Sequence, residues 1–245
     1  MPSRTSMLAK LHADPRAAGR RWWRILAGGA LLGLVLAAQM PTTTSVGLDY
    51  SVRQETEPLY QKAIAFIDRD IQMRAVALKA VGEGGTDEQR ILRLLDWTNA
   101  NIRPQPAGLP VVDDHPYHIV VRGYGVFDQA ADVLATLAAY AGMPATMLFV
   151  RPPGAFYAFA VVKVDGEWRV FDPREGHAFR DREGRLATLG ELRSDPALTK
   201  SLPAPREAVA DYPTLLAALP SVPERLRPYG QMLLRRPLQG LLPDW

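Results

Sequence analysis

The sequence predicts an α+β domain, in which a helix packs on a small antiparallel sheet, preceded by an N-terminal transmembrane helix. Three observations favour this class: an apolar segment near the N-terminus, an alanine-rich amphipathic helix pattern at residues 128–141, and three strand patterns directly after it. With 245 residues, of which 47% are hydrophobic and 22% charged, the chain is long enough to bury a sizeable core.

A basic leader opens the chain. Residues 1–24 carry six basic side chains and one acidic side chain, a net charge of +5. Removing these from the totals of 29 basic and 26 acidic residues leaves 23 basic and 25 acidic residues, a net charge of −2. Because the globular part has no excess of positive charge, a nucleic-acid partner is not expected.

An apolar segment runs from Trp22 to Met40 and is the predicted membrane anchor. As a helix, its nineteen residues would span about 28 Å, close to the roughly 30 Å hydrocarbon core of a bilayer. Its basic flank at residues 1–21 predicts a cytoplasmic N-terminus and an extracytoplasmic domain, periplasmic in a Gram-negative cell. Two alternatives stay open: a signal segment cleaved after Leu36-Ala37-Ala38, which would give a secreted form, and a buried helix.

The rest of the chain divides into three parts by composition. Residues 41–50 are low in hydrophobicity and predict a linker, and residues 51–180 are expected to form the domain. Residues 181–245 form a proline-rich C-terminal tail, because nine of the 21 prolines lie in the last 52 residues. This tail is expected to wrap the domain.

The first half of the domain contains two helix patterns and a long loop. Residues 54–80 have a mostly three-to-four spacing of apolar residues, which predicts a helix. Thr86 and Gln89 fit a capping box that begins a second helix. Residues 103–126 show no periodicity and predict an irregular loop, of a length that is usually functional.

The second half predicts a helix that feeds an antiparallel sheet. The apolar face of residues 128–141 is rich in alanine, so neighbouring elements can pack close to the helix backbone. Strand patterns follow at residues 145–150, 157–164 and 167–171. Asp165-Gly166 is a strong two-residue hairpin turn between the last two strands.

Several kinds of chemistry are excluded by residue type. The chain contains no cysteine, so it has no disulfide, no thiolate metal site and no cysteine nucleophile. Asp113, Asp114, His115 and His118 are metal-ligand types, but their spacing matches no specific site. Neither a metal nor another cofactor is therefore expected.

Three segments resemble the transglutaminase-like (papain-like cysteine) superfamily: residues 122–131, 141–145 and 159–173. In that family a cysteine follows a glycine-rich turn at the start of the core helix. A histidine opens the next strand, and an aspartate precedes a proline at the end of the third. The resemblance covers roughly residues 86–175 and implies a papain/transglutaminase-like core.

The resemblance places the family's cysteine on Phe127, its histidine on Phe159 and its aspartate on Asp172. A phenyl ring can neither attack a carbonyl nor carry a proton, so we expect a catalytically degenerate member, a pseudoenzyme without catalytic residues. The two phenylalanines have two interpretations: they fill the former cleft as core, or they form an aromatic floor for a ligand.

The predicted function is that of a membrane-anchored binding or scaffold protein with a protein or glycan partner, in cell-envelope or surface-polysaccharide assembly. Its candidate ligand-binding residues are Asp114, His115, Tyr124, Phe127 and Asp128. The alternative is a hydrolase or transferase that uses Asp128, His115 or His118 as acid or base. A third alternative is a subunit of a membrane complex whose partners order the tail.

Overall fold

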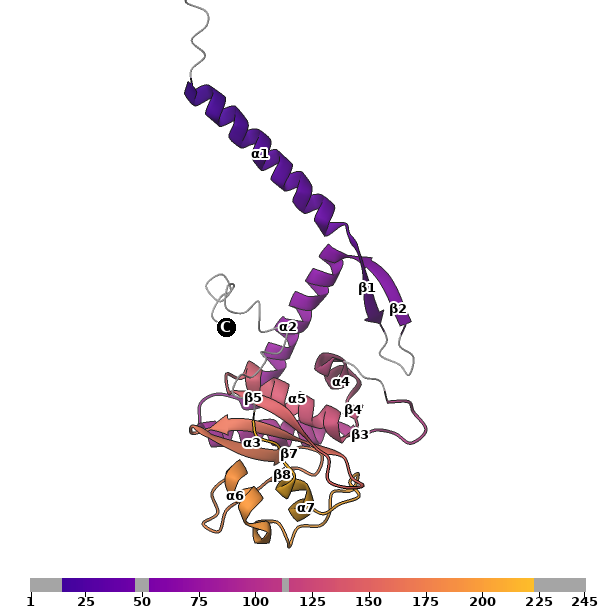
Figure 1. Cartoon of the computed structure of the whole chain (residues 1–245), viewed down its shortest axis with the longest axis vertical. Coiled ribbons are helices and arrows are strands. Elements are labelled where there is room, and N and C mark those ends of the chain that lie inside the picture. The colour runs from indigo at the N-terminus through magenta and orange to yellow at the C-terminus, as the bar shows by residue number, and fades with distance from the viewer. Residues whose placement is uncertain (1–14, 47–52, 112–114, 223–245) are drawn as a thin grey trace, which may run out of the picture. The chain divides into compact units, whose positions relative to one another are not determined.

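The computed structural model describes residues 15–46, 53–111 and 115–222 (Figure 1). Asp113 and Asp114 therefore lie outside the described residues. The described residues form two compact units, one of residues 15–46 with 54–65 and the other of residue 53 with 66–111 and 115–222. Helix α2 (Leu59–Val81) runs from the first unit into the second.

The first unit contains helix α1 (Pro15–Ala38) and a two-stranded sheet of β1 (Pro41–Val46) and β2 (Arg53–Pro58). The Thr42 hydroxyl donates a 2.9 Å hydrogen bond to the Glu57 carbonyl across this pair. The linker predicted for residues 41–50 therefore includes a strand, and the helix predicted from residue 54 begins five residues later. Both differences arise from the pairing of β1 with β2. Neither segment has a clear strand pattern in its own sequence, so the strands form because they pair with each other.

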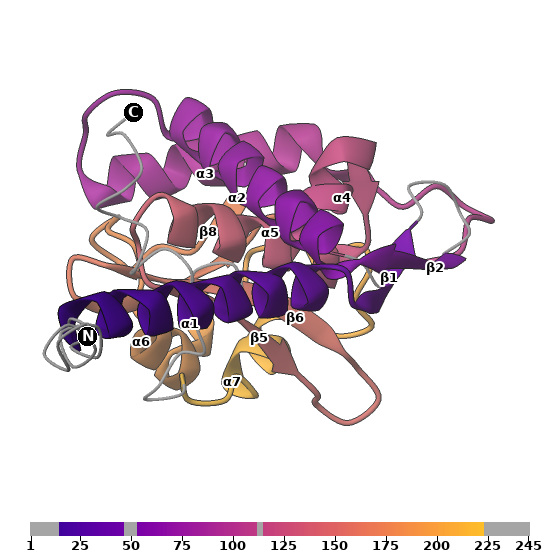
Figure 2. The same ribbon diagram turned by 90° about the horizontal axis from the view of Figure 1, so that it is seen from above.

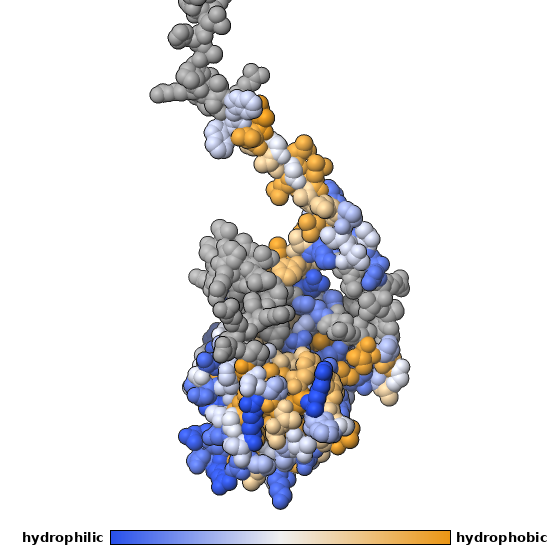
Figure 3. Space-filling view, in the orientation of Figure 1, coloured by the Kyte–Doolittle hydropathy of each residue, from blue (hydrophilic) through white to orange (hydrophobic). Residues whose placement is uncertain are grey.

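Helix α1 exposes a series of large apolar side chains: Trp22, Trp23, Ile25, Leu26, Leu31, Leu32, Leu34, Val35 and Leu36. Figure 3 shows orange, hydrophobic residues along this helix. Among the helices that the structure describes, none is both long enough and apolar enough to cross a membrane. The span predicted for residues 22–40 is thus not identified in the described part of the chain.

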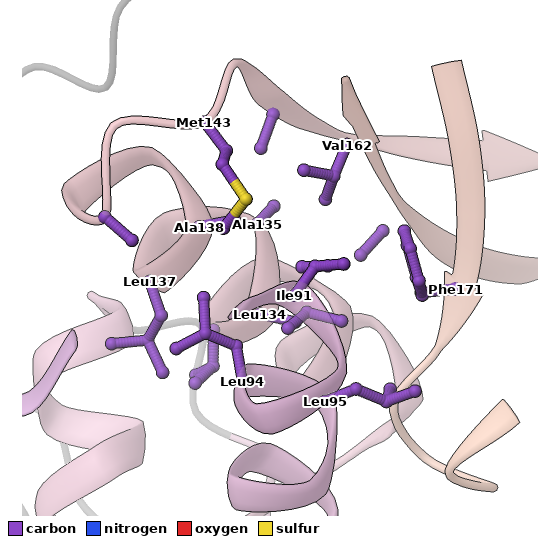
Figure 4. Close-up of a cluster of buried hydrophobic side chains, with 14 of the residues drawn as sticks. Ile91, Leu94, Leu95, Leu134, Ala135, Leu137, Ala138, Met143, Val162 and Phe171 are labelled. Atoms are coloured by element: carbon purple, nitrogen blue, oxygen red, sulfur yellow. The ribbon is translucent and has the colours of Figure 1, made fainter. Parts of the chain in front are cut away.

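The second unit is built around helix α5 (Phe127–Tyr140), most of whose residues are buried. Helix α3 (Asp87–Asn101) packs against it, and Figure 2 shows α5 between α3 and the sheet strands. Leucines and isoleucine of α3 meet Leu134 and Leu137 of α5 in the main core (Figure 4). The small side chains of Ala135 and Ala138, which are fully buried, let the sheet approach the helix backbone closely.

A four-stranded antiparallel sheet follows α5 in the order β5-β6-β7-β8. Its strands are β5 (Ala145–Val150), β6 (Tyr157–Val164), β7 (Glu167–Asp172) and β8 (His177–Ala178). The three predicted strands are confirmed, and β8 is an additional one. The turn between β6 and β7 has positive φ angles of 51° at Asp165 and 84° at Gly166, as the Asp-Gly pair predicts.

The two faces of the sheet bury separate cores. Helix α5 covers one face, while α6 (Leu189–Ser194) and α7 (Tyr212–Ala217) pack on the other, as Figure 1 shows. A short 3₁₀ helix, η2 (Pro196–Leu198), lies in the segment between these two helices. The side chains of Tyr212, Leu215 and Leu216 are fully buried, so the described part of the proline-rich tail belongs to the core of this unit.

The loop predicted for residues 103–126 contains regular structure. Strand β3 (Arg103–Pro104) pairs in parallel with β4 (Tyr124–Gly125), and α4 (Pro116–Arg122) lies between them in the sequence. His115 caps α4, because its Nδ1 accepts a 3.1 Å hydrogen bond from the Tyr117 N–H, and Gly123 ends the helix with a φ of 72°. The prediction of an irregular loop was wrong, because elements this short have no detectable periodicity.

The capping box at Thr86 gives a direct test of local stability. Its hydroxyl accepts a 3.3 Å hydrogen bond from the Gln89 N–H, and the Gln89 side chain accepts a 3.1 Å bond from the Thr86 N–H. We expect Thr86→Ala to lower the free energy of unfolding by about 1 kcal/mol, because α3 loses its N-terminal acceptor. Thr86→Ser should retain the stability. Urea unfolding of both variants checks this, and equal stability of wild type and Thr86→Ala would contradict it.

Candidate functional site

Three elements bring Phe127, Tyr157 and Asp172 together. Phe127 is the first residue of α5, Tyr157 opens β6, and Asp172 ends β7. The Phe127 and Tyr157 rings stack with centroids 4.7 Å apart and an interplanar angle of 16°. The Tyr157 hydroxyl donates a 3.0 Å hydrogen bond to Oδ2 of Asp172. Tyr157 therefore links the start of the core helix to the aspartate at the end of the third strand.

Phe159 lies two residues further along β6 and is fully buried. Its ring contacts Tyr157, Phe179 and Tyr212 at centroid distances of 5.2, 6.1 and 6.4 Å. It thus fills the core between the sheet and α7. The residue that stacks on Phe127 is Tyr157, which the sequence interpretation did not single out.

Asp172 is fully buried, and both of its carboxylate oxygens have hydrogen-bond donors. Oδ2 accepts hydrogen bonds from the hydroxyls of Tyr157, at 3.0 Å, and Tyr212, at 2.8 Å. Oδ1 accepts hydrogen bonds from the backbone N–H groups of Arg174, at 3.0 Å, and Glu175, at 3.2 Å. The carboxylate therefore connects β6, the turn after β7, and α7.

The protonation of this cluster is set by its burial. Burial raises the pKa of the Asp172 carboxyl, and hydrogen bonds from Tyr212, the Glu175 N–H and Tyr157 oppose the shift without cancelling it. Burial and the nearby Asp172 charge raise the pKa of both tyrosine hydroxyls. The tyrosines remain O–H donors, so neither can take a proton from a nucleophile at neutral pH.

The N-terminus of α5 is occupied by a carboxylate of the same chain. Oε2 of Glu207 accepts a 3.2 Å hydrogen bond from the Phe127 N–H. Oε1 of Glu207 lies 3.0 Å from Nε of Arg174, whose buried guanidinium also donates to the carbonyls of Ile102 and Gly125. Negative charge is favourable at a helix N-terminus, so Glu207 holds the segment before α7 against the start of the core helix.

The other predicted site residues lie on α4, β4 and the start of α5. His115 caps α4 and His118 lies on it, and their ring centroids are 6.3 Å apart. Tyr124 lies in β4, where the Arg122 guanidinium is 5.6 Å from its ring centroid. Oδ1 of Asp128 accepts a 2.8 Å hydrogen bond from the Gln129 N–H in the first turn of α5. Within the described ranges, no group of three or more such side chains could hold a metal ion.

Comparison with solved structures finds folds similar to this one. A proposed cysteine protease from Cytophaga hutchinsonii is 19% identical, with a TM-score of 0.40, and the match covers 49% of this chain and 42% of that one. A proposed protease from Parabacteroides distasonis is 17% identical, with a TM-score of 0.36 and coverages of 43% and 25%. A protein described as a TGase is 11% identical, with a TM-score of 0.34 and coverages of 58% and 46%.

The chain spans less than half the length of each of these three structures. No protein-family model matches the chain, and no curated protein matches it. The chain itself has an α+β fold, in which helix α5 is followed by an antiparallel sheet. The chain itself supplies no cysteine nucleophile.

The raised pKa of Asp172 predicts how stability depends on pH. Its folded pKa lies above the unfolded value of about 3.9, so the folded state loses stability as pH rises through the folded pKa and the buried group ionises. Asp172→Asn lacks this titration and can still accept both backbone N–H bonds. We expect the variant to gain stability relative to wild type between pH 3 and pH 7. Urea unfolding across this range checks it, and a shift in favour of wild type would contradict it.

Proposed function

We propose that this chain is a non-catalytic binding or scaffold domain of transglutaminase-like fold. The carrying observation is the set of contacts that join Phe127, Tyr157 and Asp172. In the family, the start of the core helix, the opening of the next strand and the end of the third strand carry the nucleophile, base and orienting acid. Here these places hold a phenyl ring, a tyrosine with a raised pKa and a buried carboxyl, a set that provides packing instead of acyl transfer.

In this proposal Tyr157 stands in place of the family's histidine. By sequence resemblance that position falls on Phe159, but the family's histidine opens the strand, and β6 opens at Tyr157. Phe159 lies two residues further along β6, on the same face of the strand, and packs between the sheet and α7. Its burial stabilises the domain by about 1.5–3 kcal/mol.

Restoring the reactive groups tests this arrangement. We expect Phe127→Cys/Tyr157→His to react with iodoacetamide at pH 6 roughly tenfold faster than Phe127→Cys alone, because an adjacent imidazolium lowers the thiol pKa. Phe127→Cys/Phe159→His is the matched control and should react no faster than the single variant. Circular dichroism establishes that each protein is folded.

The two double variants decide between the two histidine positions. A faster reaction of the Phe159→His combination would return the position to Phe159. Equal reaction of all three folded variants would remove the proposed correspondence with a catalytic triad. Wild type should show no acyl-transfer activity, and any such activity would contradict a non-catalytic role.

The proposal also places the domain outside the cytoplasm, attached to the membrane through α1. Support comes from the basic leader, whose charge favours a cytoplasmic N-terminus, and from the exposed apolar side chains of α1. Exposing this many large apolar side chains to water is unfavourable. Insertion into lipid would bury these side chains and remove that cost. A scaffold held there would serve cell-envelope or surface-polysaccharide assembly.

Membrane attachment is tested by fractionation and by reporter fusion. We expect the protein to remain with membranes in high salt, and Leu31→Arg/Leu34→Arg to release it, because charge in the apolar segment is costly in lipid. Leu78→Arg, at an exposed position of α2, is the control. A C-terminal reporter that is active only in the cytoplasm should be silent, and its activity would overturn the topology.

A further inference from the structure

Strand β5 leaves one edge of the four-stranded sheet open. It is the outermost strand, and β6 is its neighbour on the other side. The Lys163 N–H donates a 2.8 Å hydrogen bond to the Pro144 carbonyl, which fixes the alternation of the antiparallel pair. In this register, the backbone N–H and C=O groups of Met147 and Phe149 point away from β6. They have no backbone partner in the part of the chain that the structure describes.

The sequence of β5 does not protect this edge. Natural edge strands usually carry a charge, a proline or a bulge that prevents pairing with another chain. The strand Ala145–Val150 contains no charged residue and no proline. Its pairing with β6 is regular over all six residues. An open, regular and uncharged edge is able to accept another strand.

An aromatic surface, formed by Phe149 and Phe156, lies at the end of this edge. Arg151 lies beside it. Phe149 and Phe156 are 39% and 40% exposed, and their rings stack with centroids 5.3 Å apart. The Phe156 ring also meets the Phe127 ring edge-on, at 5.6 Å. The Arg151 guanidinium lies 5.3 Å from the Phe156 ring centroid, and no described carboxylate forms an ion pair with it.

We propose that the β5 edge binds an extended segment of a partner protein as a fifth strand. The segment's backbone pairs with Met147 and Phe149, an apolar side chain packs on the aromatic surface, and a carboxylate pairs with Arg151. The Met147 carbonyl accepts only a long, 3.4 Å hydrogen bond from the Thr146 hydroxyl. A sugar could stack on the rings but would leave the N–H groups of Met147 and Phe149 without a strand partner. The edge and the surface together therefore favour a polypeptide with an acidic residue. The proposal rests on the proposed binding role and names its partner class.

Selection from a library of random heptapeptides tests the proposal, with the detergent-solubilised full chain as the target. We expect enriched peptides with alternating apolar residues and an Asp or Glu. Phe149→Ala and Arg151→Gln should each weaken binding of the enriched peptides about tenfold. Val121→Ala and Lys163→Gln, which change an exposed apolar side chain and an exposed cation elsewhere, should bind them as wild type does.

Backbone methylation of an enriched peptide separates strand addition from side-chain binding. Methylation of alternate N–H groups should abolish binding in one register and leave it unchanged in the other, because only every second N–H faces β5. Equal effects in both registers would overturn strand addition. Failure to enrich any peptide, or enrichment that Phe149→Ala leaves unchanged, would overturn the proposed surface.

Sedimentation of the full chain distinguishes a second copy from a foreign partner. A wild-type dimer that becomes monomeric in Phe149→Ala would assign the edge to self-pairing and overturn the partner proposed above. The peptide and sedimentation results can be told apart from a failure of the proposed function. That function is tested separately, by the iodoacetamide reactivity of the Phe127→Cys variants. A failed selection beside a reactive Phe127→Cys/Tyr157→His variant would contradict only the peptide surface.

Discussion

The buried carboxyl of Asp172 imposes a constraint on the whole second unit. A buried carboxyl without hydrogen-bond partners costs several kcal/mol, so the chain must bring donors to it. Two come from the turn after β7, one from Tyr157 at the start of β6, and one from Tyr212 at the start of α7. The last contact joins residues 40 positions apart, and it fixes where the C-terminal segment packs on the sheet.

The same constraint explains how the start of the core helix is covered. Tyr157 has its hydroxyl on Asp172 and its ring on Phe127, so a single side chain satisfies the acid and covers the start of the core helix. Glu207 then supplies a carboxylate to the Phe127 N–H and to Arg174. Together these contacts stabilise the start of the core helix, because the Asp172 carboxyl and the Phe127 N–H have hydrogen-bond partners within the chain.

Apolar surface remains where the core does not reach. In the first unit it includes α1, and in the second it includes Phe149 and Phe156 beside the open edge of β5, in addition to exposed side chains of α2 such as Ile71 and Leu78. The two surfaces differ in chemistry. A helix whose backbone is internally paired offers only side chains to a partner, whereas a sheet edge also offers N–H and C=O groups.

The sequence alone determined the elements whose signals are local. The Thr86 capping box, the Asp165-Gly166 turn and the alanine-rich face of α5 each act within a few residues, and each is present as predicted. Tertiary structure alone decided the pairings of β1 with β2 and β3 with β4, and the meeting of Tyr157 and Tyr212 at Asp172. These depend on strand register and on the docking of α7, which bring distant residues together and leave no periodic pattern in the sequence.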